Sequence, residues 1–202
     1  LNTFGIVVPL SSAVDNRHHI GLLIATAVLS VCFLLASLTK DRRAFSRFPS
    51  LLRKSGRIVT DFYRDFGAES TMLNLGLMGL FCVLLILLTP IKVNGPVMGA
   101  ILTVMGFAAF GKHPLNSLPV VLGAILAIEL TPIEWTMGPI LAVLFVTGIA
   151  PLAGRFGFIA GLLAGFVHLL ITSRALQFQG GFDLYNNGFA AGLVAAILVP
   201  VI

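Results

Sequence analysis

A succession of apolar segments, separated by short polar stretches, constrains the fold of this chain more than any other feature. The first segment supplies about 20 apolar residues, enough for a helix that crosses a hydrocarbon core of about 30 Å. Several later segments have only about 13 to 16, so they either extend into the headgroups with their polar flanks or are half-helices that meet within the bilayer. About seven segments are predicted: 19–38, 72–88, 96–110, 118–130, 138–153, 156–171 and 188–202.

The composition agrees with a membrane protein. Only 10% of the residues are charged and the mean hydropathy is +1.02, whereas a soluble domain carries about a quarter charged residues. The sequence therefore predicts an all-α, polytopic membrane helix bundle with some segments short or re-entrant. Because the chain begins with Leu1 and stops within an apolar run at Ile202, we expect it to be a fragment or a processed piece.

A dense run of basic residues, 40–64, follows the first apolar segment. Its apolar residues recur every three to four positions, so part of it is expected to form an amphipathic helix on the membrane surface. The alternative is an ordinary cytoplasmic loop whose positive charge fixes the orientation of the chain, and this is favoured over a specific lipid or partner site. Nucleic acid is not an expected partner, because the basic residues are concentrated between two helices. Anionic lipid or a partner protein would contact Arg53, Lys54 and Arg57. We expect one membrane domain, 1–202, made of the first span with its flank (1–39), this basic segment (40–66) and a bundle (67–202).

The positive-inside rule orients the segments. If residues 40–66 are cytoplasmic, the turns at Lys112 and Arg155 are cytoplasmic as well, while Arg17, Lys92 and Arg174 lie outside. Most of the basic residues are then on the cytoplasmic side. A re-entrant pair of segments would leave this assignment unchanged.

An internal hairpin repeat is predicted from two matching pairs of positions. Gly95-Pro96 and Gly138-Pro139 lie 43 residues apart, and the same offset superposes Gly111-Lys112 on Gly154-Arg155. The repeat units lie near residues 95–130 and 138–172. Only the first unit carries His113 and Asn116 in its turn, where Asn116 or Ser117 is expected to cap the next helix.

Polar residues gather before the last apolar segment, within residues 180–192. Asp183, Asn186 and Asn187 stand next to Gly188, and Asn187 is placed to cap the helix that follows. Free amide groups at such a helix start present a partial positive charge, and side-chain amides both donate and accept hydrogen bonds. Two interpretations stay open: a binding site for a small polar solute, and a structural cap at the membrane surface.

Other polar residues in apolar surroundings point to packing. His168 is expected to make a hydrogen bond between helices, and Glu69 and Asn74 are close enough to line one cavity wall. Gly157, Gly161 and Gly165 form a small-x-x-x-small pattern that favours close helix contact. No phosphate loop, metal-ligand spacing or catalytic triad is recognised, so we expect neither an enzyme nor a metal or other cofactor.

Residues 138–202 resemble the core of the urea transporter family. The likeness rests on a glycine-containing helix (LAVLFVTGI), a helix rich in small residues (FGFIAGLLAGFVHLLI), a polar linker, and Asn187-Gly188-x-x-x-Gly192 at the start of an apolar helix. The family's Thr-x-Pro-Phe filter signature is absent. The resemblance implies an inverted-repeat channel for a small neutral solute, of which this chain would be part. The Tyr-Asn-Asn-Gly-Phe ending also resembles a bacterial integral-membrane family of unknown function.

The residues and the resemblance together predict a channel or transporter for a small polar solute. Asp183, Asn186 and Asn187 would line its pathway, with His113 and Asn116 as secondary candidates. The alternative is a non-catalytic scaffold or subunit that binds a partner or anionic lipid through residues 40–64. In either case we expect a homo-oligomer in the lipid bilayer of a bacterial inner (plasma) membrane.

Overall fold

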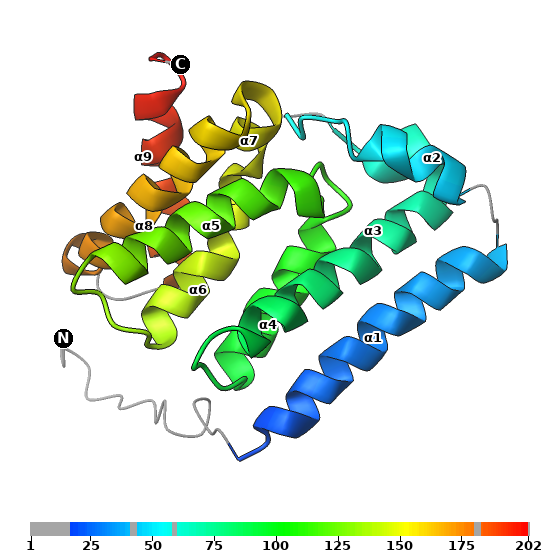
Figure 1. Ribbon diagram of the computed structural model, residues 1–202, viewed down its shortest axis with the longest axis horizontal. Coiled ribbons are helices and arrows are strands. Elements are labelled where there is room, and N and C mark those ends of the chain that lie inside the picture. The colour runs from blue at the N-terminus through cyan, green and yellow to red at the C-terminus, as the bar shows by residue number, and fades with distance from the viewer. Residues whose placement is uncertain (1–16, 41–43, 58–59, 180–182, 202) are drawn as a thin grey trace.

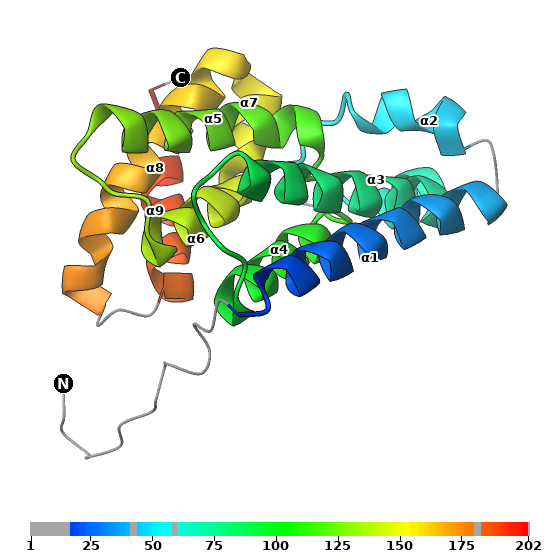
Figure 2. The same ribbon diagram turned by 60° about the horizontal axis from the view of Figure 1, so that its bottom comes forward.

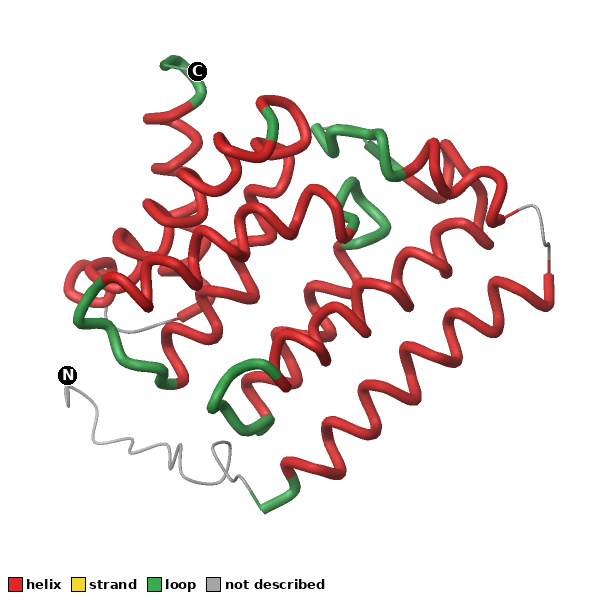
Figure 3. The backbone as a smooth tube through the Cα atoms, in the orientation of Figure 1, coloured by secondary structure: helices red, strands yellow, loops and turns green. Residues whose placement is uncertain are grey.

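The computed structural model describes residues 17–40, 44–57, 60–179 and 183–201, with the side chains of 40, 176–179 and 183–186 outside that description. Within these residues the chain forms helices and loops and no strand, as Figure 3 shows. The elements, in chain order, are α1 (His19–Lys40), α2 (Ala44–Leu51), α3 (Phe62–Leu87), α4 (Gly95–Phe107), α5 (Pro114–Leu130), α6 (Met137–Phe145), η2 (Val146–Ile149), α7 (Ala150–Phe156), α8 (Phe158–Gln179) and α9 (Asp183–Leu198).

Among the described residues, four stretches of helix are long and apolar enough to cross a membrane: 19–39 in α1, 62–87 in α3, 137–156 across α6, η2 and α7, and 158–175 in α8. Shorter apolar helices occupy 95–107, 114–130 and 187–198. The chain is therefore an all-helical integral membrane protein, in agreement with the coarse prediction from the sequence. The first predicted segment, 19–38, coincides closely with α1.

Helix α1 lies at the edge of the bundle and packs along α3 (Figures 1 and 2). Ile20, Ile24 and Val28 on α1 are exposed, as expected for a helix that faces lipid. Its inner face meets Gly76 and Gly79 of α3, where an added Cβ would overlap the Ser30 carbonyl and hydroxyl. These glycines let the two backbones approach closely.

Helix α3 begins earlier than the apolar segment predicted from Met72. Asp61 caps it, because its carboxylate accepts a hydrogen bond from the backbone N–H of Arg64 at 3.1 Å. The helix is interrupted at Gly67, which has a φ of 86°. The preceding short helix α2 packs on α3 with Ala44 and Leu51 buried and Phe45 exposed, so a small part of the basic segment is helical.

Helices α5 and α8 form the tightest crossing in the bundle. A Cβ on Gly123 of α5 would overlap the carbonyl oxygen of Leu162, and a Cβ on Gly165 of α8 would overlap that of Val120. Gly161 of α8 meets Pro119 of α5 in the same crossing, and also Ala153 of α7. The predicted close packing by Gly161 and Gly165 is thus confirmed. Gly157 acts differently: it has a φ of 92° and separates α7 from α8.

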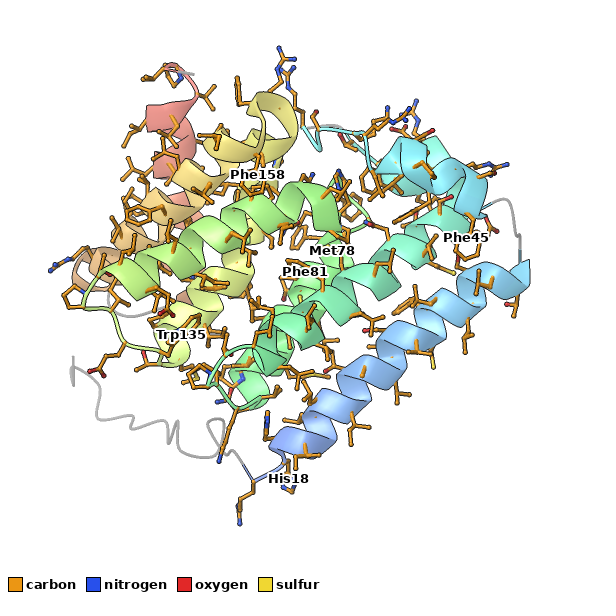
Figure 4. The ribbon with its side chains drawn as sticks, in the orientation of Figure 1. His18, Phe45, Met78, Phe81, Trp135 and Phe158 are labelled. Atoms are coloured by element: carbon orange, nitrogen blue, oxygen red, sulfur yellow. The ribbon has the colours of Figure 1, made fainter. Side chains whose placement is uncertain are left out.

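The loops gather at two ends of the bundle. At one end the His19 ring accepts a hydrogen bond from the Val93 N–H at 2.7 Å, and the Asn94 amide contacts the Met137 sulfur at 3.7 Å. Figure 4 shows His18 and Trp135 toward this end, and Phe45 and Phe158 toward the other. The second end, which we call the basic end, holds the turn 108–113, α7 and the loop residues 52–57 and 60, which we call the basic loop.

Candidate binding cleft

A cleft of about 1280 Å³ opens among elements that are far apart in the sequence. A pocket of this size accommodates a metabolite or a lipid headgroup with part of its chains. The basic loop, the start of α3, the end of α4, η2, α7 and one face of α9 supply its walls. The lining residues are Gly56, Arg57, Thr60, Asp61, Arg64, Thr103, Phe107, Phe110, Lys112, Phe145, Gly148, Pro151, Leu152, Arg155, Phe156, Asn187, Gly188, Ala191 and Val199.

The charges along the cleft are mostly positive. Among the described residues, Arg57, Arg64, Lys112 and Arg155 line it together with one carboxylate, that of Asp61. Within the described part of the chain, the one ion pair closer than 4 Å joins Lys54 to Asp65 at 3.7 Å, and neither residue lines the cleft. The cleft therefore keeps a surplus of positive charge against largely aromatic and aliphatic walls.

Lys112 is the least exposed of these cations. Its ammonium donates a hydrogen bond to the Thr147 hydroxyl at 3.3 Å and lies over the Phe107 ring, 5.1 Å from the ring centre. A cation over an aromatic face is stabilised by the ring quadrupole. Burial nevertheless disfavours the charged form and lowers the pKa of Lys112 to about 8.

Asn74 of α3 holds the turn that presents Lys112. Its side-chain amide is fully buried and donates to the carbonyl of Ala108 at 2.8 Å and to the carbonyl of Lys112 at 2.6 Å. The Ala108 carbonyl is at the C-terminal end of α4, where helix carbonyls have no partner within the helix, and the Lys112 carbonyl directly precedes the cap of α5. Asn74 therefore fixes the backbone on either side of Gly111.

His113 caps α5, where the sequence predicted Asn116 or Ser117. The extended backbone of His113 lets its Nδ1 accept from the Asn116 N–H at 3.3 Å, while the Asn116 side chain accepts from the His113 N–H at 3.0 Å. Because Nδ1 accepts, the proton is on Nε2, which donates to the Lys54 carbonyl at 2.8 Å. The cap therefore also ties α5 to the basic loop.

Three glycines bring the basic loop against the bundle. Gly56 packs on Gly111, and both have a positive φ, of 78° and 94°. A Cβ on Gly154 would overlap the carbonyl oxygen of Ser55. The Gly-cation pairs noted in the sequence, at Gly111 and at Gly154, thus both contact the loop at the basic end. Lys112 and Arg155 follow these glycines directly, which brings both cations to the cleft.

Asn187 lies in the cleft next to Gly188, on the first turns of α9. It is buried, and its backbone carbonyl is 3.3 Å from Nε2 of His168 on α8. The predicted helix-packing role of His168 is therefore confirmed. The side chains of Asp183 and Asn186 lie outside the described residues, so their predicted place in the pathway is left as a prediction.

The structure brings together some of the candidates from the sequence and separates others. Asn187 and Arg57 both line the cleft. His113 and Asn116 instead occupy the cap of α5, behind the cleft wall, and their proposed contact with a solute stays a prediction. Arg53 and Lys54 are exposed on the basic loop.

The aromatic walls and Lys112 were not selected as site residues from the sequence. The sequence does contain a signal for Lys112 and Arg155, since both follow a glycine in the predicted repeat, but a cation in a short turn by itself indicates only the orientation of the chain. Within the described residues, no group of three or more His, Cys, Asp or Glu side chains is placed to hold a metal ion.

Comparison with known proteins gives one match. Residues 40–202 match the family described as "Protein of unknown function (DUF1576)". The chain belongs to this family. The matched range of DUF1576 contains every residue that lines the cleft, while α1 lies almost entirely before it. No curated protein and no solved structure matches the chain.

The cap of α5 leads to a pH prediction for this DUF1576 protein. Burial lowers the pKa of His113 below the ordinary value of 6.5. The unfolded state then binds more protons between the two values, so the contribution of His113 to stability is complete above about pH 6.5 and decreases as the pH falls toward the lower folded pKa. We expect the melting temperature to drop over this range and the drop to be smaller in His113→Asn, which keeps a capping side chain.

The measurement is the melting temperature in detergent between pH 8 and pH 4.5. His18→Asn is the matched control, because His18 is exposed at the start of α1. Equal pH dependence in the wild type and His113→Asn would show that the cap does not depend on a neutral imidazole.

Proposed function

We propose that this protein is a membrane channel or transporter for a small polar solute, and that the cleft is part of the solute's path. The observation that carries the proposal is the course of the cleft along α9, from Asn187 to Val199. At 1.5 Å per residue this stretch spans roughly 18 Å, a large part of a hydrocarbon core of about 30 Å. The resemblance to the urea transporter family also favours a place for Asn187 on the solute's path, because the Asn-Gly-x-x-x-Gly element begins at Asn187.

The orientation belongs to the same proposal. The basic loop, the turn at Lys112 and Arg155 gather at one end, so a cytoplasmic basic end agrees with the positive-inside rule. We propose that α4, α5 and α9 cross together with the four longer stretches, which gives seven crossings. A bacterial inner membrane and a homo-oligomeric assembly complete the proposal.

We also propose that the two hairpins are related by an internal repeat. Two observations support it. Gly123 contacts Leu162, and Gly165 contacts Val120. Gly165 lies 42 residues after Gly123, and Leu162 lies 42 residues after Val120, so one offset relates the two contacts. Asn94 and Met137, at the starts of α4 and α6, are 43 residues apart and in contact. Reciprocal contacts of this kind are expected between two parallel hairpins around a local two-fold axis.

Solute flux into liposomes tests the function. We expect purified protein to pass one of a panel of small solutes, comprising neutral amides such as urea and acetamide and small anions such as acetate. Asn187→Leu should reduce that flux about tenfold or more, because a lost hydrogen bond to a buried polar solute leaves it unpaired. Thr39→Val, on α1 outside the cleft, is the control and should leave flux unchanged.

Two outcomes would count against this proposal. Unchanged flux in a folded Asn187→Leu protein would remove Asn187 from the path. Absence of flux for every solute would favour the alternative function, a scaffold that binds anionic lipid or a partner. The specific observation in its favour is that Phe45 and Arg47 are both exposed on α2, which precedes the cations of the basic loop. Loss of lipid or partner retention on changing Arg53, Lys54 and Arg57 would then support it.

A further inference from the structure

Orientation signals account for only part of the positive charge in the cleft. Arg57, Arg64 and Arg155 are exposed, as cations at a cytoplasmic membrane surface are expected to be. Lys112 is different, because it is half-buried and its ammonium lies over the Phe107 ring. A charge that only orients a helix gains nothing from burial, and desolvation makes such a position unfavourable.

The ammonium of Lys112 has hydrogen-bonding capacity to spare. It has three N–H donors, and the hydroxyl of Thr147 accepts from one of them. Of the side chains that the structure describes, Asp61 is the carboxylate that lines the same cleft, and it caps α3 by accepting from the Arg64 N–H. Among the described residues, no carboxylate lies within 4 Å of Lys112.

We infer that the cleft binds an anionic group, a carboxylate, phosphate or sulfate, on the ammonium of Lys112. Arg57, Arg64 and Arg155 surround this group with positive potential, and Phe107, Phe145 and Phe156 offer an apolar surface to whatever carries it. The inference rests on the proposed function, since it places the solute in the same cleft and names its chemical class. The anionic group belongs either to a free solute or to a lipid headgroup, and the two sources share this chemistry.

Two binding arms separate the sources, with the full chain in nanodiscs and the melting temperature as the readout. The first arm uses phosphatidylcholine discs and titrates sodium sulfate against sodium chloride at equal ionic strength. The second arm omits sulfate and compares phosphatidylglycerol with phosphatidylcholine. A ligand that binds the folded state raises the melting temperature by mass action. Stabilisation by sulfate indicates a free anion, and stabilisation by phosphatidylglycerol alone indicates a headgroup.

Lys112→Met should weaken the response about tenfold or more, the effect expected from losing a hydrogen bond to a charged group. Lys92→Met is the matched control, because Lys92 is an exposed lysine at the opposite end of the bundle, and it should respond as the wild type does. Lys112→Met removes a poorly solvated charge, so it should fold. A Lys112→Met protein that responds like the wild type in both arms would overturn the inference.

A pH profile of the wild type tests the same inference without a substitution. Sulfate keeps its charge across the range, so its affinity should fall as the pH rises through about 8, where Lys112 loses its proton. The other charged or titratable groups that face Lys112 are Arg57, Arg64, Arg155 and Asp61 of the cleft, and Cys82 of α3. Cys82→Ser should show the same profile. An affinity that stays constant from pH 7 to 9.5 would overturn the inference.

The inference and the proposed function can fail separately. Binding of the anion that depends on Lys112, with no flux of any solute, would contradict transport and leave the site in place. Flux of a neutral amide that depends on Asn187, with no response in either binding arm, would contradict the anion site and leave transport in place.

Discussion

Gly123→Ala should destabilise the protein by about 1 to 3 kcal/mol, the range found for overpacked contacts. The added methyl group would overlap the carbonyl oxygen of Leu162, a backbone atom that cannot rotate away, so α5 and α8 would have to separate. Alanine favours a helix over glycine by about 1 kcal/mol, but this gain is smaller than the loss expected at the crossing. Thermal or denaturant unfolding in detergent measures the difference.

Gly99→Ala and Gly106→Ala on α4 are the controls, because an added Cβ at either position meets nothing within 4 Å. Both should be neutral or slightly stabilising. Gly165→Ala faces Val120 across the same crossing, so the double variant with Gly123→Ala should lose less stability than the two single losses combined. A Gly123→Ala protein as stable as Gly99→Ala would show that the two helices do not cross at these glycines.

The same crossing shows what the sequence can and cannot predict about the fold. The four-residue spacing of Gly161 and Gly165 predicts a close helix contact, and the structure has one there. The partner could not be predicted, because Gly123 on α5 has no matching glycine four residues away and its role depends on the carbonyl groups of α8. Every residue has a backbone carbonyl, so the sequence does not indicate which carbonyl a glycine will meet. The pairing of α5 with α8 therefore requires the three-dimensional structure.

Helix boundaries depend in the same way on individual side chains. The apolar pattern places the start of the second span at Met72, but Asp61 starts α3 at Phe62, across the irregular residue Gly67. At α5 the capping side chain is a histidine, which is an unusual cap, and Asn116 supports it from inside the helix. Hydropathy locates the segments well, whereas hydrogen bonds at their ends decide where each helix begins.

The candidate cleft was only partly predictable for a related reason. Asn187 stood out because an amide beside a glycine at the head of an apolar helix is rare in such a chain. Lys112 is also marked in the sequence, by its place after Gly111 in the predicted repeat, but a cation in a short turn is usually an orientation signal. Its contact with Phe107 and Thr147 depends on how the turn at Gly111 is folded, and the hydropathy pattern contains no information about that turn.

Asn74→Leu should have the second large effect, a loss of about 2 to 5 kcal/mol in the free energy of unfolding. The leucine cannot donate, so the carbonyls of Ala108 and Lys112 would each lose a hydrogen bond, at about 1 to 3 kcal/mol per buried group left unsatisfied. Hydropathy alone predicts the opposite, because leucine suits an apolar helix better than asparagine. The sign of the change therefore separates a hydrogen-bonding role for Asn74 from a purely apolar environment.

Ser70→Ala is the matched control, one helical turn earlier on α3. Ser70 is also fully buried, but its hydroxyl has no hydrogen-bond partner among the described residues, so its removal should be neutral or stabilising. Because Asn74 holds the carbonyl of Lys112, Asn74→Leu should also weaken the response to sulfate or phosphatidylglycerol, while Ser70→Ala keeps it. An Asn74→Leu protein that is less stable but responds to the anion like the wild type would show that Lys112 binds the anion without the turn that Asn74 holds.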